Sequence, residues 1–410
     1  MSIEGIETLV VEELPNLLLV QVHLDSGIVG LGETYYGAAA AEAHLHEALA
    51  PALVGRAMPR DADELRALLT ELEGYVGYLG SGAEVRALSA VDLALWDAMG
   101  QEAGLPLTEL LGGRVRSDVQ IYNTCAGPHY MRNPSGQKSA NWGVAGEGRH
   151  EDLYGFLHHA DRLAEDLLSE GVSAMKIWPF DVYAERSAGR EISRADLDAG
   201  LGPLRKVRDA VGDRMRLLVE LHGLWEPSAA RVILAALAEF DPLWVEDPIR
   251  PDRYAELGEL RAASPVPIAA GETLGGRTAV APLLDRRGVD VLIADLGWCG
   301  GISEVLALAE RTLAAEVPLA LHDCSGPVVL AASAHLAVHL PHVFIQETTR
   351  AYYSSWYPQL VTGLPDISAG RLSPGTAPGH GVRLRPDLDQ SATVRRRVTG
   401  ATHPLPLARS

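Results

Sequence analysis

Two different patterns of apolar and polar positions divide the chain near residue 118. Before it, the stretch TLVVEELPNLLLVQVHLDSGIVGLGE alternates strand-like runs with a turn at residues 25–27, which is typical of an antiparallel meander. Apolar residues then recur at helical spacing, and the last such segment stops at Gly104 and Pro106. The expected helices are 39–53, 61–75 and 82–103. We therefore expect residues 1–117 to form a small α+β domain.

From residue 118 onward, short apolar strands alternate with amphipathic helices. Eight strands are expected: 119–123, 174–178, 216–221, 243–247, 267–272, 291–295, 319–323 and 343–347. Near-continuous apolar strands separated by helices predict a parallel sheet covered on both faces, and eight units are the number that closes a (β/α)₈ barrel. An open doubly wound sheet is the alternative, but its Gly-rich phosphate loop is missing from YNTCAGPHYM after the first strand.

The remaining segments complete this organisation. The barrel is expected over residues 118–350, and residues 351–410 are expected to return and pack on the N-terminal domain. Two long segments follow the first and second barrel strands, at 127–150 and 179–196. Long loops are usually functional when they are ordered, so we interpret the first as an active-site loop.

Almost every expected barrel strand ends in a polar or ionisable residue. One such residue alone would be a solvated charge at a strand end. In a barrel, however, all the C-terminal strand ends meet at one mouth, where the active site lies. The residues are Asn123, Lys176, Glu220 with His222, Glu246 with Asp247, Glu272, Asp295, His322 with Asp323, and Glu347.

Three glutamates end consecutive strands at intervals of 26 residues, one strand–helix unit each: Glu220, Glu246 and Glu272. Neighbouring strands lie about 4.8 Å apart, so the carboxylates converge. They would repel one another unless a cation lay between them. Oxygen ligands without cysteine favour a hard ion, and Mg²⁺ fits best because it takes octahedral oxygen ligation and leaves positions open.

Asp295 and His322 end the sixth and seventh strands. An aspartate beside a histidine orients the ring and raises its basicity. Such a pair alone is often only a buried hydrogen bond. Beside three converging glutamates it is a candidate acid/base pair.

Composition excludes several classes of partner. The net charge of −19 argues against nucleic acid and anionic membranes, and no apolar run reaches the length of a transmembrane helix. Three cysteines without a CxxC pair indicate a reduced, cytoplasmic protein. The basic cluster at residues 395–397 is expected to be a solvated tail.

Several stretches together resemble one protein family. DSGIVGLGET (25–34) and SAVDLALWDAMGQEAGLPLTELLGG (89–113) lie in the N-terminal part, and VELH, WVEDP, AAGET, DVLIADLGWCGGISE (290–304), LHD (321–323) and FIQE (344–347) lie in the barrel. The combination resembles the enolase superfamily, in its mandelate racemase-like branch, over essentially the whole chain. The resemblance implies that the three glutamates bind Mg²⁺, that His322 with Asp295 acts as acid/base, and that Glu347 hydrogen-bonds the substrate carboxylate or its enolate.

The chain departs from this family at two positions. The first metal ligand, Glu220, is more often aspartate there. Racemases and lactonising enzymes carry Lys-x-Lys on the second strand, whereas this chain has Lys176 followed by Trp178, and an indole cannot take a proton from carbon. Lys176 would then remain as a cation near the substrate carboxylate. Sugar-acid dehydratases of the branch, of the galactonate and mannonate types, carry a general-acid histidine two residues after the first metal ligand, which His222 matches.

Three functions follow from these residues. A Mg²⁺-dependent sugar-acid dehydratase is favoured; a racemase, epimerase or cycloisomerase and a non-catalytic binding barrel are the alternatives. We also expect a small carboxylic acid as substrate and a homo-oligomer. The residues expected to contact the substrate are Tyr35, Tyr36, Asn123, Lys176, Trp178, Asp181 and Glu347, with the loop 127–150.

Overall fold

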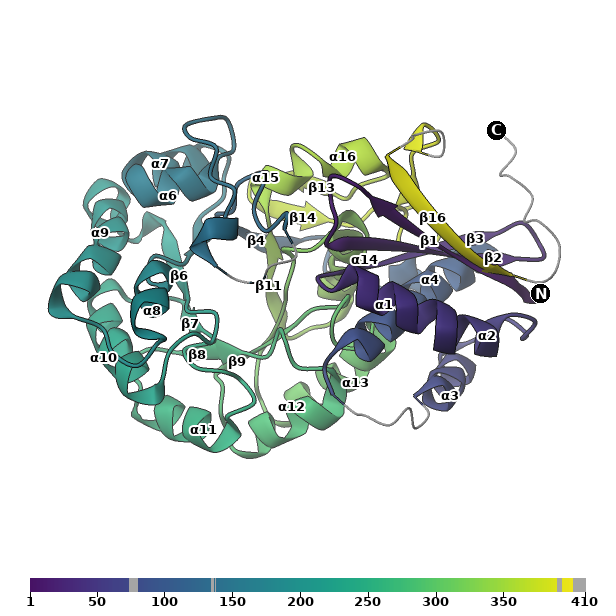
Figure 1. The fold of residues 1–410 in the computed structure, drawn as a ribbon, viewed down its shortest axis with the longest axis horizontal. Coiled ribbons are helices and arrows are strands. Elements are labelled where there is room, and N and C mark those ends of the chain that lie inside the picture. The colour runs from purple at the N-terminus through teal and green to yellow at the C-terminus, as the bar shows by residue number, and fades with distance from the viewer. Residues whose placement is uncertain (74–79, 134–135, 137, 389–392, 401–410) are drawn as a thin grey trace.

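A closed barrel of eight parallel strands forms the larger part of the computed structural model, which describes residues 1–73, 80–133, 136, 138–388 and 393–400 (Figure 1). Each strand pairs with the next, and the last pairs with the first. The strands are β4 (Val119–Thr124), β5 (Ala174–Ile177), β6 (Arg216–Glu220), β7 (Trp244–Glu246), β8 (Ile268–Ala270), β9 (Val291–Ala294), β10 (Leu319–Leu321) and β11 (Val343–Thr348). The predicted barrel is confirmed, and the open doubly wound sheet is wrong.

Side chains fill the inside of the barrel and helices cover its outside. Tyr122, Leu218 and Trp244 are among the fully buried residues that point inward, so the barrel is a packed core and not a pore. The outer helices are α6 (Asp152–His158), α7 (Ala160–Ser169), α9 (Arg194–Val211), α10 (Pro227–Leu237), α11 (Tyr254–Ala263), α12 (Gly276–Asp285), α13 (Ile302–Ala314) and α14 (Pro327–His339). A further helix, α8 (Asp181–Ser187), lies in the segment 179–196 that follows β5.

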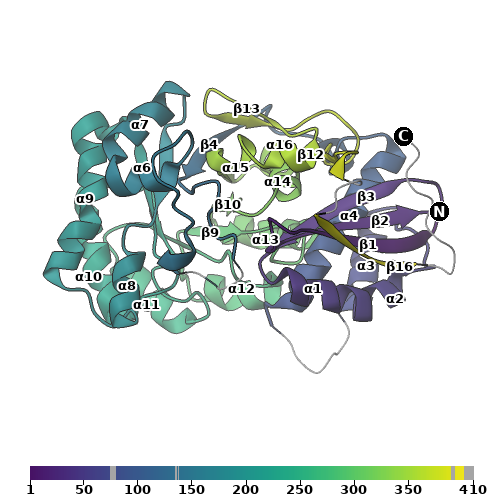
Figure 2. The ribbon, with the colours of Figure 1, turned by 45° about the horizontal axis from the view of Figure 1, so that its top comes forward.

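An antiparallel sheet with its own helices packs beside the barrel (Figures 1 and 2). We call it the cap. It contains β1 (Ile3–Val11), β2 (Leu17–Leu24), β3 (Val29–Tyr35), α1 (Ala38–His44), α2 (Ala50–Leu53), α3 (Ala62–Leu72), α4 (Ala83–Ala103) and α5 (Leu107–Leu110). A π-helical turn joins α1 to α2, and residues 74 and 75 of the expected helix 61–75 lie outside the described residues. No helix in the described ranges combines the length and apolarity that a bilayer crossing requires.

The C-terminal segment contacts both parts of the molecule. Its last strand, β16 (Val394–Gly400), pairs antiparallel with β1 at the edge of the cap sheet. The expectation of a solvated tail at 395–397 is therefore wrong: these arginines lie within β16, and Arg395 forms an ion pair of 2.7 Å with Glu42. Residues 389–392 and 401–410 lie outside the described residues. The other elements are α15 (Arg350–Tyr353), α16 (Tyr357–Leu360), β12 (Val361–Thr362), β13 (Asp366–Ser368), β14 (Arg371–Ser373) and β15 (Arg383–Leu384).

One carboxylate of the cap binds the N-terminus of an outer helix of the barrel. Glu33 of β3 is fully buried, and its Oε1 accepts a 2.7 Å hydrogen bond from the backbone N–H of Val329, in the first turn of α14. Carboxylates are favoured at helix N-termini because the free N–H groups and the helix dipole attract negative charge. Burial raises the pKa of Glu33 to about 8. This contact orders the cap directly above the loop that carries His322.

The glycines of β3 allow helix α4 to lie against the cap sheet. A Cβ atom on Gly32 would lie 1.9 Å from the backbone oxygen of Ala90, and one on Gly30 would lie 2.0 Å from that of Ala94. No side chain fits at either position, since both obstacles are backbone. The GLG pattern therefore specifies a close strand–helix contact.

We expect Gly32→Ala to lower the thermal midpoint strongly, because overpacking against a rigid backbone costs about 1–3 kcal/mol or more. Gly375→Ala is the matched control. A Cβ on Gly375 meets nothing within 4 Å, and its φ is not in the left-handed region. Alanine restricts the unfolded chain more than glycine does, so this variant should be neutral or slightly stabilised. Equal midpoints for the two variants in calorimetry would contradict the packing argument.

Candidate active site

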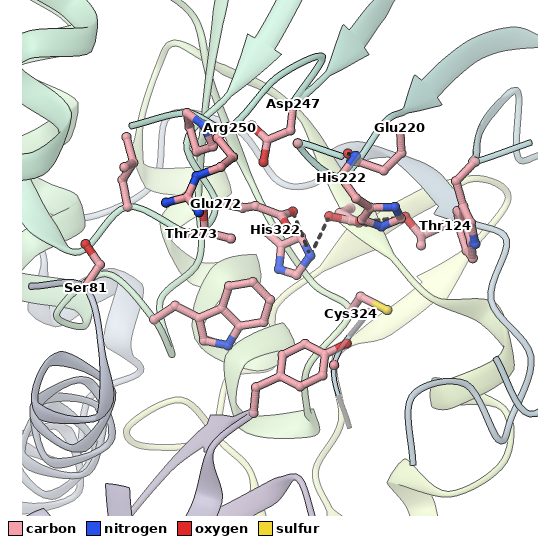
Figure 3. A pocket seen from close by; sticks show the side chains of 18 of the residues that line it. Ser81, Thr124, Glu220, His222, Asp247, Arg250, Glu272, Thr273, His322 and Cys324 are labelled. Carbon is pink, nitrogen blue, oxygen red and sulfur yellow. Dashed lines mark hydrogen bonds and ion pairs between the residues drawn. The ribbon is translucent and has the colours of Figure 1, made fainter. Parts of the chain in front are cut away.

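A cavity of about 680 Å³ opens at the C-terminal ends of the barrel strands, beneath the cap (Figure 3). Barrel residues form most of its wall, and Tyr36 and Arg86 reach it from the cap. The long loop 127–150 contributes Tyr130 and Gly136 to the wall; residues 134, 135 and 137 of that loop lie outside the described residues. The predicted position of the site at the strand ends agrees with this cavity.

The three glutamates converge at the floor of this cavity. Glu220 and Glu246 are directly opposite each other in the β6–β7 register, and Glu272 follows the end of β8. One carboxylate oxygen from each lies within 4.8 Å of the others, and all three residues are buried. Burial raises the pKa of each carboxyl, and repulsion between neighbouring glutamates adds to the rise.

The donor set fits a hard divalent cation. Oε1 of Glu220 accepts a 2.6 Å hydrogen bond from the backbone N–H of His222, but its Oε2 is buried and accepts none. Asp247, which also lines the cavity, has a buried Oδ1 without a hydrogen bond. Buried carboxylate oxygens without a hydrogen bond match the ligands that Mg²⁺ requires. Glu220, Glu246 and Glu272 are the residues that would hold such an ion.

Lys176 is the cation that the structure places among these carboxylates. Its Nζ lies 3.1 Å from Glu246, 3.0 Å from Glu347 and 3.6 Å from Glu220. Burial alone would lower the pKa of Lys176, but the carboxylates outweigh burial and raise it well above its usual value. Lys176 thus remains a fixed positive charge beside Glu347.

His322 and Asp295 form a close pair on one wall. Nδ1 of His322 lies 2.6 Å from Oδ2 of Asp295, whose Oδ1 accepts a hydrogen bond from the N–H of Gly297. The other ring nitrogen faces the cavity, 3.3 Å from Glu272. Burial would lower the pKa of His322, but the surrounding carboxylates, with Glu347 foremost, raise it to about 10. A cation on the glutamates would lower it again.

His222 forms a second histidine–aspartate pair. Its Nδ1 lies 2.8 Å from Oδ2 of Asp181, which is buried at the start of α8. Burial would lower the pKa of His222, but Asp181 and Glu220 raise it to about 9. Strand alternation predicts that His222 shares a face with Glu220, and both line the cavity. The geometry is different, however, because β6 ends at Glu220 and His222 adopts a left-handed φ of 50°.

Three of the residues expected to contact the substrate do not line the cavity. Asn123 is buried, donates to Asp152 at 2.8 Å and accepts from the backbone N–H of Arg350; the cavity residue of β4 is Thr124, whose side chain alternates to the opposite face. Tyr35, the last residue of β3, is buried within the cap, and Asp181 lies behind His222.

The other expected residues do line the cavity: Tyr36, Lys176, Trp178 and Glu347. Oε1 of Glu347 also accepts a hydrogen bond from the hydroxyl of Thr124, and its Oε2 accepts one from the N–H of Asp323 at 3.1 Å. Burial would raise the pKa of Glu347, but Lys176 and His322 lower it to about 2.

Sequence reasoning missed several cavity residues. Trp298 packs on His322 with 4.7 Å between ring centroids. It lies in DLGWCGG, one of the stretches that resemble the family, so the sequence did contain a signal for it. Arg86 has no comparable signal, because it lies in a helix far from the barrel strands in the sequence. The missed lining residues include Asn16, Ser81, Arg86, Thr124, Arg250, Thr273 and Trp298.

Family models match both parts of the chain. Residues 159–388 match the model described as enolase C-terminal domain-like, and residues 10–112 match that of the mandelate racemase / muconate lactonizing enzyme N-terminal domain. The chain is 41% identical to a solved structure described as an enolase of the mandelate racemase subgroup from Agrobacterium tumefaciens. That match covers 98% of this chain and 99% of the other, with a TM-score of 0.85.

Two further relatives are named as dehydratases. D-xylonate dehydratase of Haloferax volcanii is 28% identical over 391 residues, which cover 95% of this chain and 87% of that protein. D-galactonate dehydratase of Ralstonia nicotianae is 28% identical over 391 residues, covering 93% of this chain and 91% of the relative.

The carboxylate cluster generates a metal-binding prediction. Mg²⁺ should raise the thermal midpoint of the protein, since an ion at 100 times its Kd stabilises the folded state by about 2.7 kcal/mol. Glu246→Gln removes one negative charge and should abolish most of this shift. Glu259→Gln, on the exposed face of α11, should leave it unchanged. The same Mg²⁺-induced shift in the Glu246 variant as in the wild type would contradict this metal site.

Proposed function

The chain belongs to the enolase superfamily, in its mandelate racemase branch, and we propose that it is a Mg²⁺-dependent dehydratase of sugar acids. The observation that carries the proposal is the presence of two histidines on the cavity wall, each held by its own aspartate, beside three converging glutamates. Sequence similarity to relatives named D-xylonate dehydratase and D-galactonate dehydratase supports the proposal.

Dehydration requires removal of the proton α to a carboxylate and loss of a β-hydroxyl group. When bound at the glutamates, a divalent cation supplies positive charge that stabilises the enediolate form of the substrate. Lys176 adds a fixed positive charge on the same side of the cavity, and Glu347 holds it there. Interactions with charge that develops during the reaction usually make the largest contribution to the rate.

His322 is the proposed base for the α-proton. Asp295 binds Nδ1, which leaves Nε2 directed at the cavity. The aspartate fixes the orientation of the ring and stabilises the charge that forms when the ring accepts a proton. Trp298 packs against the same ring and restricts its rotation.

His222 is the proposed acid for the leaving hydroxyl. Protonation of that hydroxyl lets it depart as water, and the negative charge of Asp181 favours the protonated ring. Trp178 contacts His222 at 5.9 Å between ring centroids and occupies the position of the second lysine in the racemases that the sequence resembles. This arrangement favours elimination over exchange of a proton between two faces of one carbon.

A screen of sugar acids with Mg²⁺ tests the proposal most directly. Formation of a 2-keto-3-deoxy acid supports dehydration. An isomer of unchanged mass would instead identify a racemase, epimerase or cycloisomerase. Failure to exchange α-deuterium with any acid of a broad library would indicate a non-catalytic barrel.

We expect His322→Asn to slow exchange of the substrate α-proton in deuterated water by at least about 10²-fold, the lower range for general acid–base catalysis. Mg²⁺ binding should be retained, since His322 is not among the proposed ligands. His158→Asn, on an exposed position of α6, is the control and should exchange normally. Normal exchange in the His322 variant would place the base elsewhere.

We expect His222→Asn to separate two steps. Elimination of the β-hydroxyl should slow by about 10²–10⁴-fold, while α-proton exchange through His322 continues. Asp181→Asn should show the same pattern more weakly, because it removes only the charge that holds the ring. Deuterium uptake into recovered substrate, measured beside keto-acid formation, distinguishes the steps. Equal losses in both rates would show that His222 has a structural role.

A further inference from the structure

Arg86 is a cation of the cavity wall that contacts no carboxylate among the described residues, although the negative charges of Asp295 and Glu272 act on it from a longer distance. Its Nη1 donates a 2.6 Å hydrogen bond to the backbone oxygen of Tyr35, and its Cζ lies 4.5 Å above the ring of Trp298. In the part of the chain that the structure describes, no carboxylate lies within ion-pair distance of it. By contrast, Lys176 contacts three carboxylates, and Arg250 contacts Asp252 at 2.5 Å.

The surroundings of Arg86 favour an anion. Arg86 lies in the first turn of α4, where the helix dipole disfavours a positive side chain and attracts negative charge. The N-cap residue of this helix, Gly82, supplies no side-chain hydrogen bond. A partly buried guanidinium retains five N–H donors, of which the backbone of Tyr35 engages one group only. The remaining N–H groups can donate to both oxygens of a carboxylate in two-point contact.

The position of Arg86 suits the distal end of a bound substrate. Trp298 contacts the Arg86 guanidinium, and the same indole packs on the proposed base His322. Lys176 and the glutamates lie at the floor of the cavity, formed by the barrel, whereas Arg86 belongs to the cap. The cavity therefore presents a positive charge on the cap in addition to the positive charges on the barrel.

We propose that the substrate is a dicarboxylic sugar acid, with one carboxylate at Lys176 and the metal site and the second carboxylate on Arg86. The inference rests on the proposed function, because it names the substrate class of the same site. A monocarboxylic sugar acid would place a hydroxyl at Arg86, which accepts a hydrogen bond but leaves the guanidinium without a contacting carboxylate. Charge-assisted pairs are about twice as strong as neutral hydrogen bonds, so the two classes should be discriminated.

Matched pairs of acids test the inference: galactarate against galactonate, and glucarate against gluconate, which differ in the oxidation state of the last carbon. Titration calorimetry with Mg²⁺ gives Kd, and keto-acid formation gives KM. The wild type should bind the diacid of at least one pair about 10- to 100-fold more tightly than its monoacid. Arg86→Gln should weaken diacid binding more than monoacid binding, because the diacid loses a charged pair and the monoacid only a hydrogen bond, and should thereby remove this preference.

Two further variants complete the design. Arg86→Lys retains the charge without the forked geometry and should keep part of the preference for diacids. This variant provides the test if Arg86→Gln fails to fold. Arg205→Gln, which alters a surface arginine paired with Asp198, should bind as the wild type does.

Different results would contradict the dicarboxylic-acid inference and the dehydratase proposal. Tighter binding of monoacids, or a diacid preference that survives loss of Arg86, would overturn the inference about the second carboxylate. Turnover of either class of acid would still support the dehydratase. Arg86-dependent diacid binding without α-proton exchange or keto-acid formation would uphold the site and overturn the dehydratase.

Discussion

Mutual repulsion among buried carboxylates is the constraint on which the site depends. Glu220, Glu246, Glu272 and Glu347 lie together at the floor of one cavity, and Lys176 is the cation that contacts three of them. One ammonium group cannot balance four carboxylates in a medium of low dielectric. Burial, together with this surplus of negative charge, raises the pKa values of the three proposed ligands, and a divalent cation would relieve the repulsion.

The same surplus of negative charge raises the pKa values of the two neighbouring histidines, His222 and His322. Each ring has one nitrogen bound to an aspartate and lies next to glutamates, so positive charge on the ring is favoured in both cases. Their roles can still differ, because they stand on different strands and their surroundings differ. His322 contacts Glu272 and Trp298, whereas His222 contacts Trp178 and donates its backbone N–H to the Glu220 carboxylate.

The cap completes the cavity and is fixed to the barrel by buried polar contacts. Glu33 binds the first turn of α14, and Asp92 of α4 accepts hydrogen bonds from Ser303 at the start of α13. These contacts determine where Tyr36 and Arg86 meet the barrel residues. Tyr36 has a positive φ of 65°, and such uncommon backbone conformations are found at functional sites when the surrounding structure enforces them.

The sequence alone determined the barrel, the strand ends and the three converging glutamates, because hydrophobic periodicity and regular spacing are local properties that a one-dimensional pattern records. It also brought His322 and Asp295 together, since neighbouring parallel strands place their ends side by side. Only the tertiary structure decided that Thr124 and not Asn123 faces the cavity, that Asp181 holds His222, and that Arg86 reaches the site. Those outcomes depend on where a strand ends, on a residue with a left-handed backbone conformation, and on how the cap packs against the barrel. None of these features produces a periodic pattern of residues in the sequence.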